Sequence, residues 1–88
     1  METKILNILI LNWNNKKVLS DCITSIKNSN FTLYDLTVID NGSSDDSINY
    51  IKNKFSDINF IKIESNLGFA KGYNFAFEKL KDSKYEWY

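Results

Sequence analysis

The residues best able to do chemistry lie in three short polar segments that each follow an apolar run. The segments are Asn12-Trp13-Asn14, Asp40-Asn41-Gly42-Ser43 and Ser65-Asn66-Leu67-Gly68. Asp40 carries the clearest chemistry, because an ionised carboxylate only accepts hydrogen bonds. It could take the N3–H of uracil or thymine, or the N1–H edge of guanine, but it would refuse the acceptor N3 of cytosine. A charged hydrogen bond of this kind contributes about 1.5–3 kcal/mol, which is enough to discriminate between bases.

Glycines and helix starts near these segments suit a phosphate group. The three glycines of the chain, Gly42, Gly68 and Gly72, all fall in the segments or in the helical turn after the last of them. Glycine lets backbone N–H groups approach a ligand closely, and a helix N-terminus presents the positive end of its dipole. Lys71 falls in a first helical turn, where a cation is unfavourable. That position suggests an anionic partner, although a solvated lysine is the commoner case.

Each of these residues also has a purely structural interpretation. Gly42 could only make a tight turn, and Ser43 could only cap a helix. Asp40 could cap the turn that follows it, and Trp13 could either stack on a base or cover the edge of the sheet. The coincidence of three such segments favours a ligand site.

Apolar periodicity predicts the strands and helices that position the segments. Strands are predicted over Ile5–Leu11, Leu36–Ile39 and Ile58–Ile63, with a fourth opening at 85–88. Helical stripes are predicted through Val18, Leu19, Cys22, Ile23 and Ile26, through Ile48, Ile51 and Phe55, and through Phe69, Ala70, Tyr73, Ala76, Phe77 and Leu80. The expected N-caps are Asn14 or Asn15 for the first helix and Ser43 or Ser44 for the second.

The order β-α-β-α-β-α-β predicts a Rossmann-like α/β fold with a parallel sheet in one domain over residues 1–88. Ligands of such sheets bind beyond the carboxyl ends of the strands. The three polar segments should therefore meet at one edge of the sheet.

Composition excludes several classes of function. Eleven lysines balance eleven acidic residues, so the chain has no net positive charge to attract nucleic acid. Without arginine it also has no guanidinium group to bind a phosphate through two hydrogen bonds. The absence of histidine rules out a Ser-His-Asp triad, and neither G-x-x-x-x-G-K-[ST] nor G-x-G-x-x-G occurs. A single cysteine, Cys22, and an apolar run too short to span a bilayer predict a cytoplasmic protein, with a peripheral position on the membrane as an alternative. The acidic pair Asp45-Asp46 is explained by compensation of a helix dipole.

Four ordered motifs resemble the N-terminal part of family 2 glycosyltransferases of the GT-A fold. They are "ILILNWNN", "DCITSI", "TVIDNGSSDDS" and "NLGFAKGYNFA", and together they cover essentially the whole chain. The first is similar to rhamnosyltransferase-like members. The resemblance implies that this part binds the nucleotide of a sugar donor, preferably a dTDP- or UDP-sugar, whose sugar passes to a glycan or lipid-linked acceptor.

The resemblance also implies roles for individual residues. Asn12, Trp13 and Asn14 would flank the base and ribose, Asp40 would contact the base, Asn41, Gly42 and Ser43 would shape the same pocket, and Asn66, Gly68 and Lys71 would lie along the base and diphosphate. Family members then carry an Asp-x-Asp motif that holds Mg²⁺ or Mn²⁺, and a later Asp or Glu as general base. Two positions depart from the family pattern, with Asp46 where glycine is usual and Lys71 where arginine is also common.

The Asp-x-Asp motif would begin at about the position where this sequence ends, so we expect an inactive, truncated donor-binding part with no metal ligands or catalytic residues of its own. Its apolar end, Tyr85, Trp87 and Tyr88, is expected to form a strand edge that pairs with another copy. The alternatives are a small non-catalytic nucleotide-binding or structural module and a phospho-receiver-like regulator. The receiver is disfavoured, because Asn12-Trp13-Asn14 supplies no carboxylate for magnesium.

Overall fold

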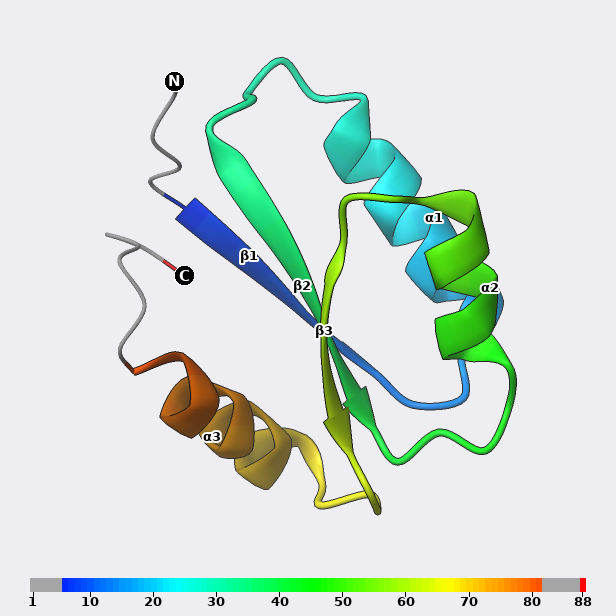
Figure 1. Cartoon of the computed structure of the whole chain (residues 1–88), viewed down its shortest axis with the longest axis vertical. Coiled ribbons are helices and arrows are strands. Elements are labelled where there is room, and N and C mark those ends of the chain that lie inside the picture. The colour runs from blue at the N-terminus through cyan, green and yellow to red at the C-terminus, as the bar shows by residue number, and fades with distance from the viewer. Residues whose placement is uncertain (1–5, 82–87) are drawn as a thin grey trace.

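Three parallel strands alternate with three helices in the computed structural model, which describes residues 6–81 and residue 88. The elements are β1 (Leu6–Asn12), α1 (Lys16–Lys27), β2 (Tyr34–Asn41), α2 (Ser47–Lys54), β3 (Asn59–Ile63) and α3 (Phe69–Leu80). The strand order is β1-β2-β3, with β2 in the centre (Figure 1). The predicted Rossmann-like α/β arrangement is confirmed. The fourth strand, predicted at 85–88, falls on residues that lie almost entirely outside the described ones.

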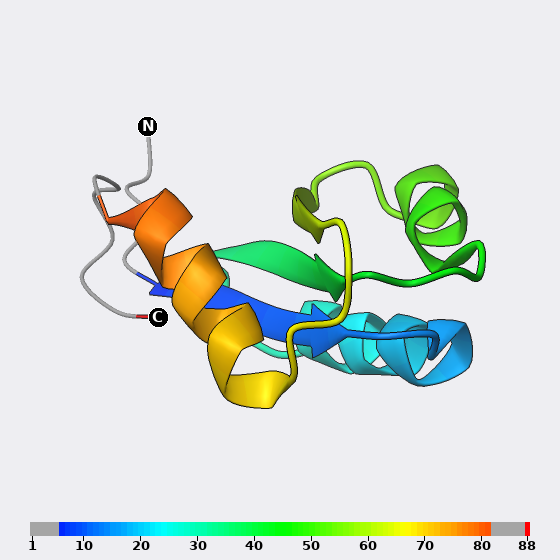
Figure 2. The same cartoon turned by 90° about the horizontal axis from the view of Figure 1, so that it is seen from below.

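Helices cover both faces of the sheet, with α1 and α2 on one face and α3 on the other (Figures 1 and 2). Successive side chains of a strand point to opposite faces. On the α1–α2 face the buried core consists of Leu19, Ile23, Leu36, Val38 and Ile51. On the α3 face it consists of Ile39, Ile63 and Ala76. By the same alternation, Asp40 belongs to the α1–α2 face and Asn41 to the α3 face.

The strands extend further toward the polar segments than predicted. β1 runs through Asn12, and β2 runs two residues past the predicted end, through Asp40 and Asn41. The reason is the ladder of the central strand, in which Asp40 pairs with Asn12 on one side and with Lys62 on the other. Asn12, Asp40 and Asn41 therefore belong to the strands and not to the loops.

The predicted caps of the second helix are wrong. α2 begins only at Ser47, with Asp46 in the N-cap position. Ser43 and Ser44 are instead held by hydrogen bonds to Asn14, which keep that segment out of the helix.

The first helix is capped only in part as predicted. Asn15 occupies the N-cap position of α1, but its side chain makes no capping hydrogen bond. Asn14 does not cap the helix, because its backbone has a φ of 48° and its side chain reaches the neighbouring loop.

Several residues of the predicted helical stripes are exposed. Val18 is 58% exposed, Phe69 is 74% exposed and Phe77 is 45% exposed. In α3 the buried residues are Gly72 and Ala76, and the half-buried Tyr73 and Phe75 pack against the same core. The covered stripe therefore includes Phe75, which was not predicted, and leaves Phe69 and Phe77 exposed. Among the described residues, no helix combines the length and apolar character that crossing a bilayer would require.

Candidate functional site

A buried polar cluster joins the carboxyl ends of β1 and β2. The Asn12 amide donates from Nδ2 to Asp40 Oδ1 at 3.2 Å and to Ser43 Oγ at 3.3 Å. The other carboxylate oxygen of Asp40 accepts from the backbone N–H of Ser43 at 3.3 Å. Asn12 and Asp40 are 3% and 2% exposed. The turn-capping role of Asp40 is therefore present, and a carboxylate with two such contacts still has lone pairs for a ligand.

Asn14 fastens the loop after β1 to the loop after β2. Its backbone N–H donates to Ser43 Oγ at 2.9 Å, and its Oδ1 accepts from the N–H groups of Ser44 at 2.7 Å and Asp45 at 3.1 Å. The positive φ of Asn14 places the amide for these contacts, and asparagine tolerates that conformation better than most residues. The two loops thus form one surface beside Asp40.

A second polar cluster lies on the α3 face and centres on Asn41, which is 2% exposed. Its Nδ2 donates to Asn66 Oδ1 at 3.2 Å and to the carbonyl oxygen of Gly68 at 3.1 Å, and its Oδ1 accepts from Leu67 N at 2.9 Å. Asn66 Oδ1 also accepts from Gly68 N at 2.7 Å. Asn41 therefore shapes the loop between β3 and α3.

Gly42 lets the loops after β2 and β3 touch. Its φ is +79°, and a Cβ placed on it would lie 2.5 Å from the backbone nitrogen of Asn66. Gly68 has a similar φ of +83°, but open space surrounds the position of its missing Cβ. Close approach thus explains Gly42, whereas backbone conformation alone explains Gly68.

Eight of the ten predicted site residues belong to these two connected groups. Asn12, Asn14, Asp40 and Ser43 form the first, and Asn41, Gly42, Asn66 and Gly68 form the second. Trp13 is 53% exposed, and Lys71 is exposed on the first turn of α3. Neither joins the hydrogen-bond networks, and their predicted contacts with a donor stay predictions.

A hollow of about 200 Å³ opens beside Asp40 and Ser43. Its lining adds two lysines that sequence reasoning missed, Lys52 and Lys62. The sequence signal for Lys62 is a charge between Ile61 and Ile63 of a predicted strand, which marks a solvent-facing position. The register that places it beside Asp40 is seen only in the structure. A separate hollow of about 310 Å³ lies along β1 and α1, where Asn12 and Trp13 line it.

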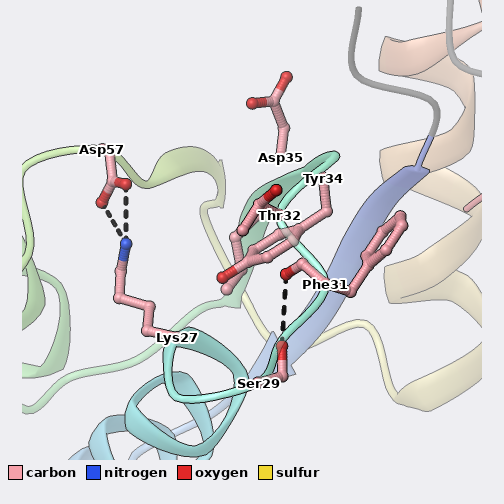
Figure 3. Close-up of a pocket in the computed structure, with 8 residues that line it drawn as sticks. Lys27, Ser29, Phe31, Thr32, Tyr34, Asp35 and Asp57 are labelled. Atoms are coloured by element: carbon pink, nitrogen blue, oxygen red, sulfur yellow. Dashed lines mark hydrogen bonds and ion pairs between the residues drawn. The ribbon is translucent and has the colours of Figure 1, made fainter. Parts of the chain in front are cut away.

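A third hollow, of about 270 Å³, lies at the opposite end of β2 and contains none of the predicted site residues. Figure 3 shows Lys27 and Asp57 pointing toward each other at its rim, where Lys27 Nζ lies 2.6 Å and 2.7 Å from the two carboxylate oxygens. The rings of Phe31 and Tyr34 stack with their centres 6.3 Å apart. This hollow lies at the other end of β2 from the three polar loops and is not part of the candidate site.

An exposed ion pair ties α1 to the loop before α2. Lys16 Nζ lies 3.0 Å from Asp46 Oδ1. The hydrogen bond and positive charge of Lys16 lower the pKa of Asp46, and the same contact raises the pKa of Lys16. The Lys16–Asp46 pair therefore places a second link beside the Asn14 contacts.

The described residues do not supply a metal site. They contain no group of three or more histidine, cysteine, aspartate or glutamate side chains that could hold an ion. Asp45 and Asp46 are committed to Ser47 and Lys16 respectively. The divalent ion that the resemblance implies does not fit these residues.

Comparison with known proteins gives one result that bears on this site. A family profile described as "Glycosyl transferase family 2" matches residues 7–85, a span that includes both polar clusters and all three loops. A search of curated proteins found no match.

Proposed function

This chain belongs to glycosyl transferase family 2, and we propose that its described residues bind the nucleotide of a sugar donor at the carboxyl edge of the sheet. The single observation that carries the proposal is Asp40, a buried carboxylate at the end of the central strand whose two protein partners are both donors. A family 2 enzyme transfers a sugar from such a donor to an acceptor, so a base-reading group at this edge has a direct use.

The proposed nucleotide is UDP or dTDP. Asp40 can accept the N3–H of uracil or thymine, or the N1–H of guanine, and the resemblance favours the two pyrimidine donors. Lys71 and the helix start at Gly68 would lie toward the diphosphate.

The resemblance also supports a glycan or lipid-linked acceptor, and Mg²⁺ or Mn²⁺ held by residues other than the described ones. The single cysteine and the short apolar run support a cytoplasmic location, with peripheral membrane contact as an alternative.

We also propose that this chain binds the donor without moving its sugar. The chain has no histidine, and its described residues offer no metal cluster to stabilise a leaving diphosphate. Release of sugar from UDP- or dTDP-sugars by the purified chain would contradict this part of the proposal.

Titration calorimetry of the chain with UDP, dTDP and CDP tests the binding function. We expect UDP and dTDP to bind at least tenfold more tightly than CDP, because the charged hydrogen bond contributes about 1.5–3 kcal/mol. Asp40→Asn keeps the size of the side chain but removes its charge, and it should weaken UDP binding by roughly 10- to 100-fold.

Asp21→Asn is the matched control, because it removes an exposed carboxylate that pairs with Lys17 on α1 and does not line the hollow beside Asp40. It should leave the affinity for UDP unchanged. Equal affinities for UDP and CDP, or equal losses in Asp40→Asn and Asp21→Asn, would sink the proposal.

We finally propose that copies of the chain associate through the edge of β1 that no described strand covers. The predicted edge residues Tyr85 and Trp87 lie outside the described residues. β1, however, pairs only with β2 among the described strands, and it carries neither charge nor proline to block further pairing. Light scattering measures this association.

A further inference from the structure

The buried amide of Asn12 has an unusual arrangement of hydrogen bonds. Its Nδ2 donates to both Asp40 Oδ1 and Ser43 Oγ, whereas its Oδ1 is buried and has no partner among the described residues. Turning the amide over would bring its oxygen against a carboxylate oxygen, and two acceptors would then face each other. The observed orientation therefore leaves one acceptor unsatisfied in order to keep both amide hydrogens on Asp40 and Ser43.

The other buried asparagine of β1 behaves differently. Asn7 is 1% exposed, and its Oδ1 accepts a hydrogen bond from Thr37 Oγ1 at 2.9 Å. Buried polar atoms in proteins are normally satisfied in this way. An asparagine kept at position 12 with its oxygen unpaired is poorly explained by stability alone.

One bond from Asn12 and one from Asn14 together determine what Ser43 can do. A hydroxyl group has two acceptor lone pairs and one hydrogen. Ser43 Oγ accepts from Asn12 Nδ2 at 3.3 Å and from Asn14 N at 2.9 Å, so both lone pairs are occupied. Its O–H is left as a donor, and no hydrogen bond within the described residues uses it. Ser43 lines the same hollow as Asp40.

We propose that Asn12 is a positioning residue of the base site: it orients the Asp40 carboxylate, which is the acceptor, and it leaves the Ser43 hydroxyl as a donor. The inference rests on the proposed function and adds a determinant of base specificity to it. The matching ligand edge has an N–H beside a C=O, as in uracil and thymine. In cytosine the corresponding ring nitrogen and carbonyl are both acceptors, so Asp40 would face a lone pair.

The test compares UDP with N3-methyl-UDP, which lacks the hydrogen that Asp40 would accept. Asn12→Leu keeps a similar volume but removes both amide hydrogens. We expect it to weaken UDP binding about tenfold while leaving the weaker binding of N3-methyl-UDP unchanged. Asn7→Leu is the matched control, since it removes a buried asparagine at the other end of the same strand and should alter neither affinity.

Each outcome decides the matter. Equal losses for the two nucleotides in Asn12→Leu would mean a general structural role, and an unchanged affinity for UDP would mean no role in base recognition. Either result would overturn the inference and leave the proposed function standing. Failure of the native chain to bind UDP would overturn both.

A second measurement on the native chain serves if Asn12→Leu does not fold. The side-chain amide hydrogens of Asn12 should exchange with water more slowly than those of exposed Asn53, and they should shift when UDP is added. Exchange as fast as that of Asn53, or the absence of a shift in saturating UDP, would overturn the inference.

Discussion

The substitution Gly42→Ala tests whether contact between two loops builds the candidate site. Its new Cβ would meet three backbone atoms, at 2.5 Å from Asn66 N, 2.6 Å from Ser65 C and 2.8 Å from Ser65 Cα. Backbone atoms cannot rotate away as the end of a side chain can. The loops after β2 and β3 would have to separate, and the hydrogen bonds between Asn41 and the loop after β3 would be strained with them.

The magnitude follows from two contributions. An alanine at φ +79° costs about 1–2 kcal/mol from the backbone conformation. The overlap with the neighbouring loop adds about 1–3 kcal/mol, as overpacking usually does. The sum is about 2–5 kcal/mol, against a total stability of roughly 4–13 kcal/mol for a domain of this size.

Gly68→Ala separates the two contributions. Its φ of +83° and ψ of 173° also carry a conformational cost for alanine, about 1–3 kcal/mol, but its Cβ would meet nothing within 4 Å. Urea denaturation followed by circular dichroism should therefore show a smaller loss than for Gly42→Ala, about 1–3 kcal/mol. Equal losses of stability for the two alanine variants would refute the claim that loop contact, rather than backbone conformation, requires glycine at position 42.

Two further predictions concern the surface. The Lys16–Asp46 pair lowers the pKa of Asp46, so the stabilisation that the pair contributes should be present at neutral pH and disappear as the pH falls through that lowered pKa. The same stabilisation should disappear as the pH rises through the raised pKa of Lys16. Urea midpoints across both ranges should show these changes in the native chain and not in Asp46→Asn, and an identical pH dependence in both would contradict the assignment. For β1, light scattering at about 0.1 mM should show species larger than a monomer; a clean monomer would count against association through this edge.

The fold can be predicted from the sequence because the spacing of apolar residues in each segment fits either a strand or a helix. The continuous run before Asn12 fits a strand covered on both faces, and the spacing of Leu19 and Ile23 fits a helix that packs on it. The parallel pairing followed from the alternation of strands and helices. Phe69 belongs to a predicted helical stripe but is exposed, because periodicity does not reveal which part of a stripe the sheet covers.

The site was harder to predict at the level of contacts. Asp40 and Ser43 were identified from their residue types, but the loss of Ser43 as a helix cap depends on Asn14, which lies 29 residues earlier in the chain. Local capping rules do not include a competing partner from another loop. Lys62 was missed for the same reason, since only the register of the sheet places it beside Asp40.

The adjacent residues Asp40 and Asn41 illustrate how a strand end can serve two purposes. Because neighbouring side chains point to opposite faces, Asp40 meets Asn12 and Ser43 on the α1–α2 face, whereas Asn41 meets the loop that leads to α3. Each oxygen and nitrogen of the Asn41 amide is used within the protein. Asp40 and Ser43, by contrast, keep hydrogen-bonding capacity that their described partners do not exhaust. Asn41 therefore builds the loops at this edge, whereas Asp40 keeps acceptor capacity for the nucleotide that we propose it binds.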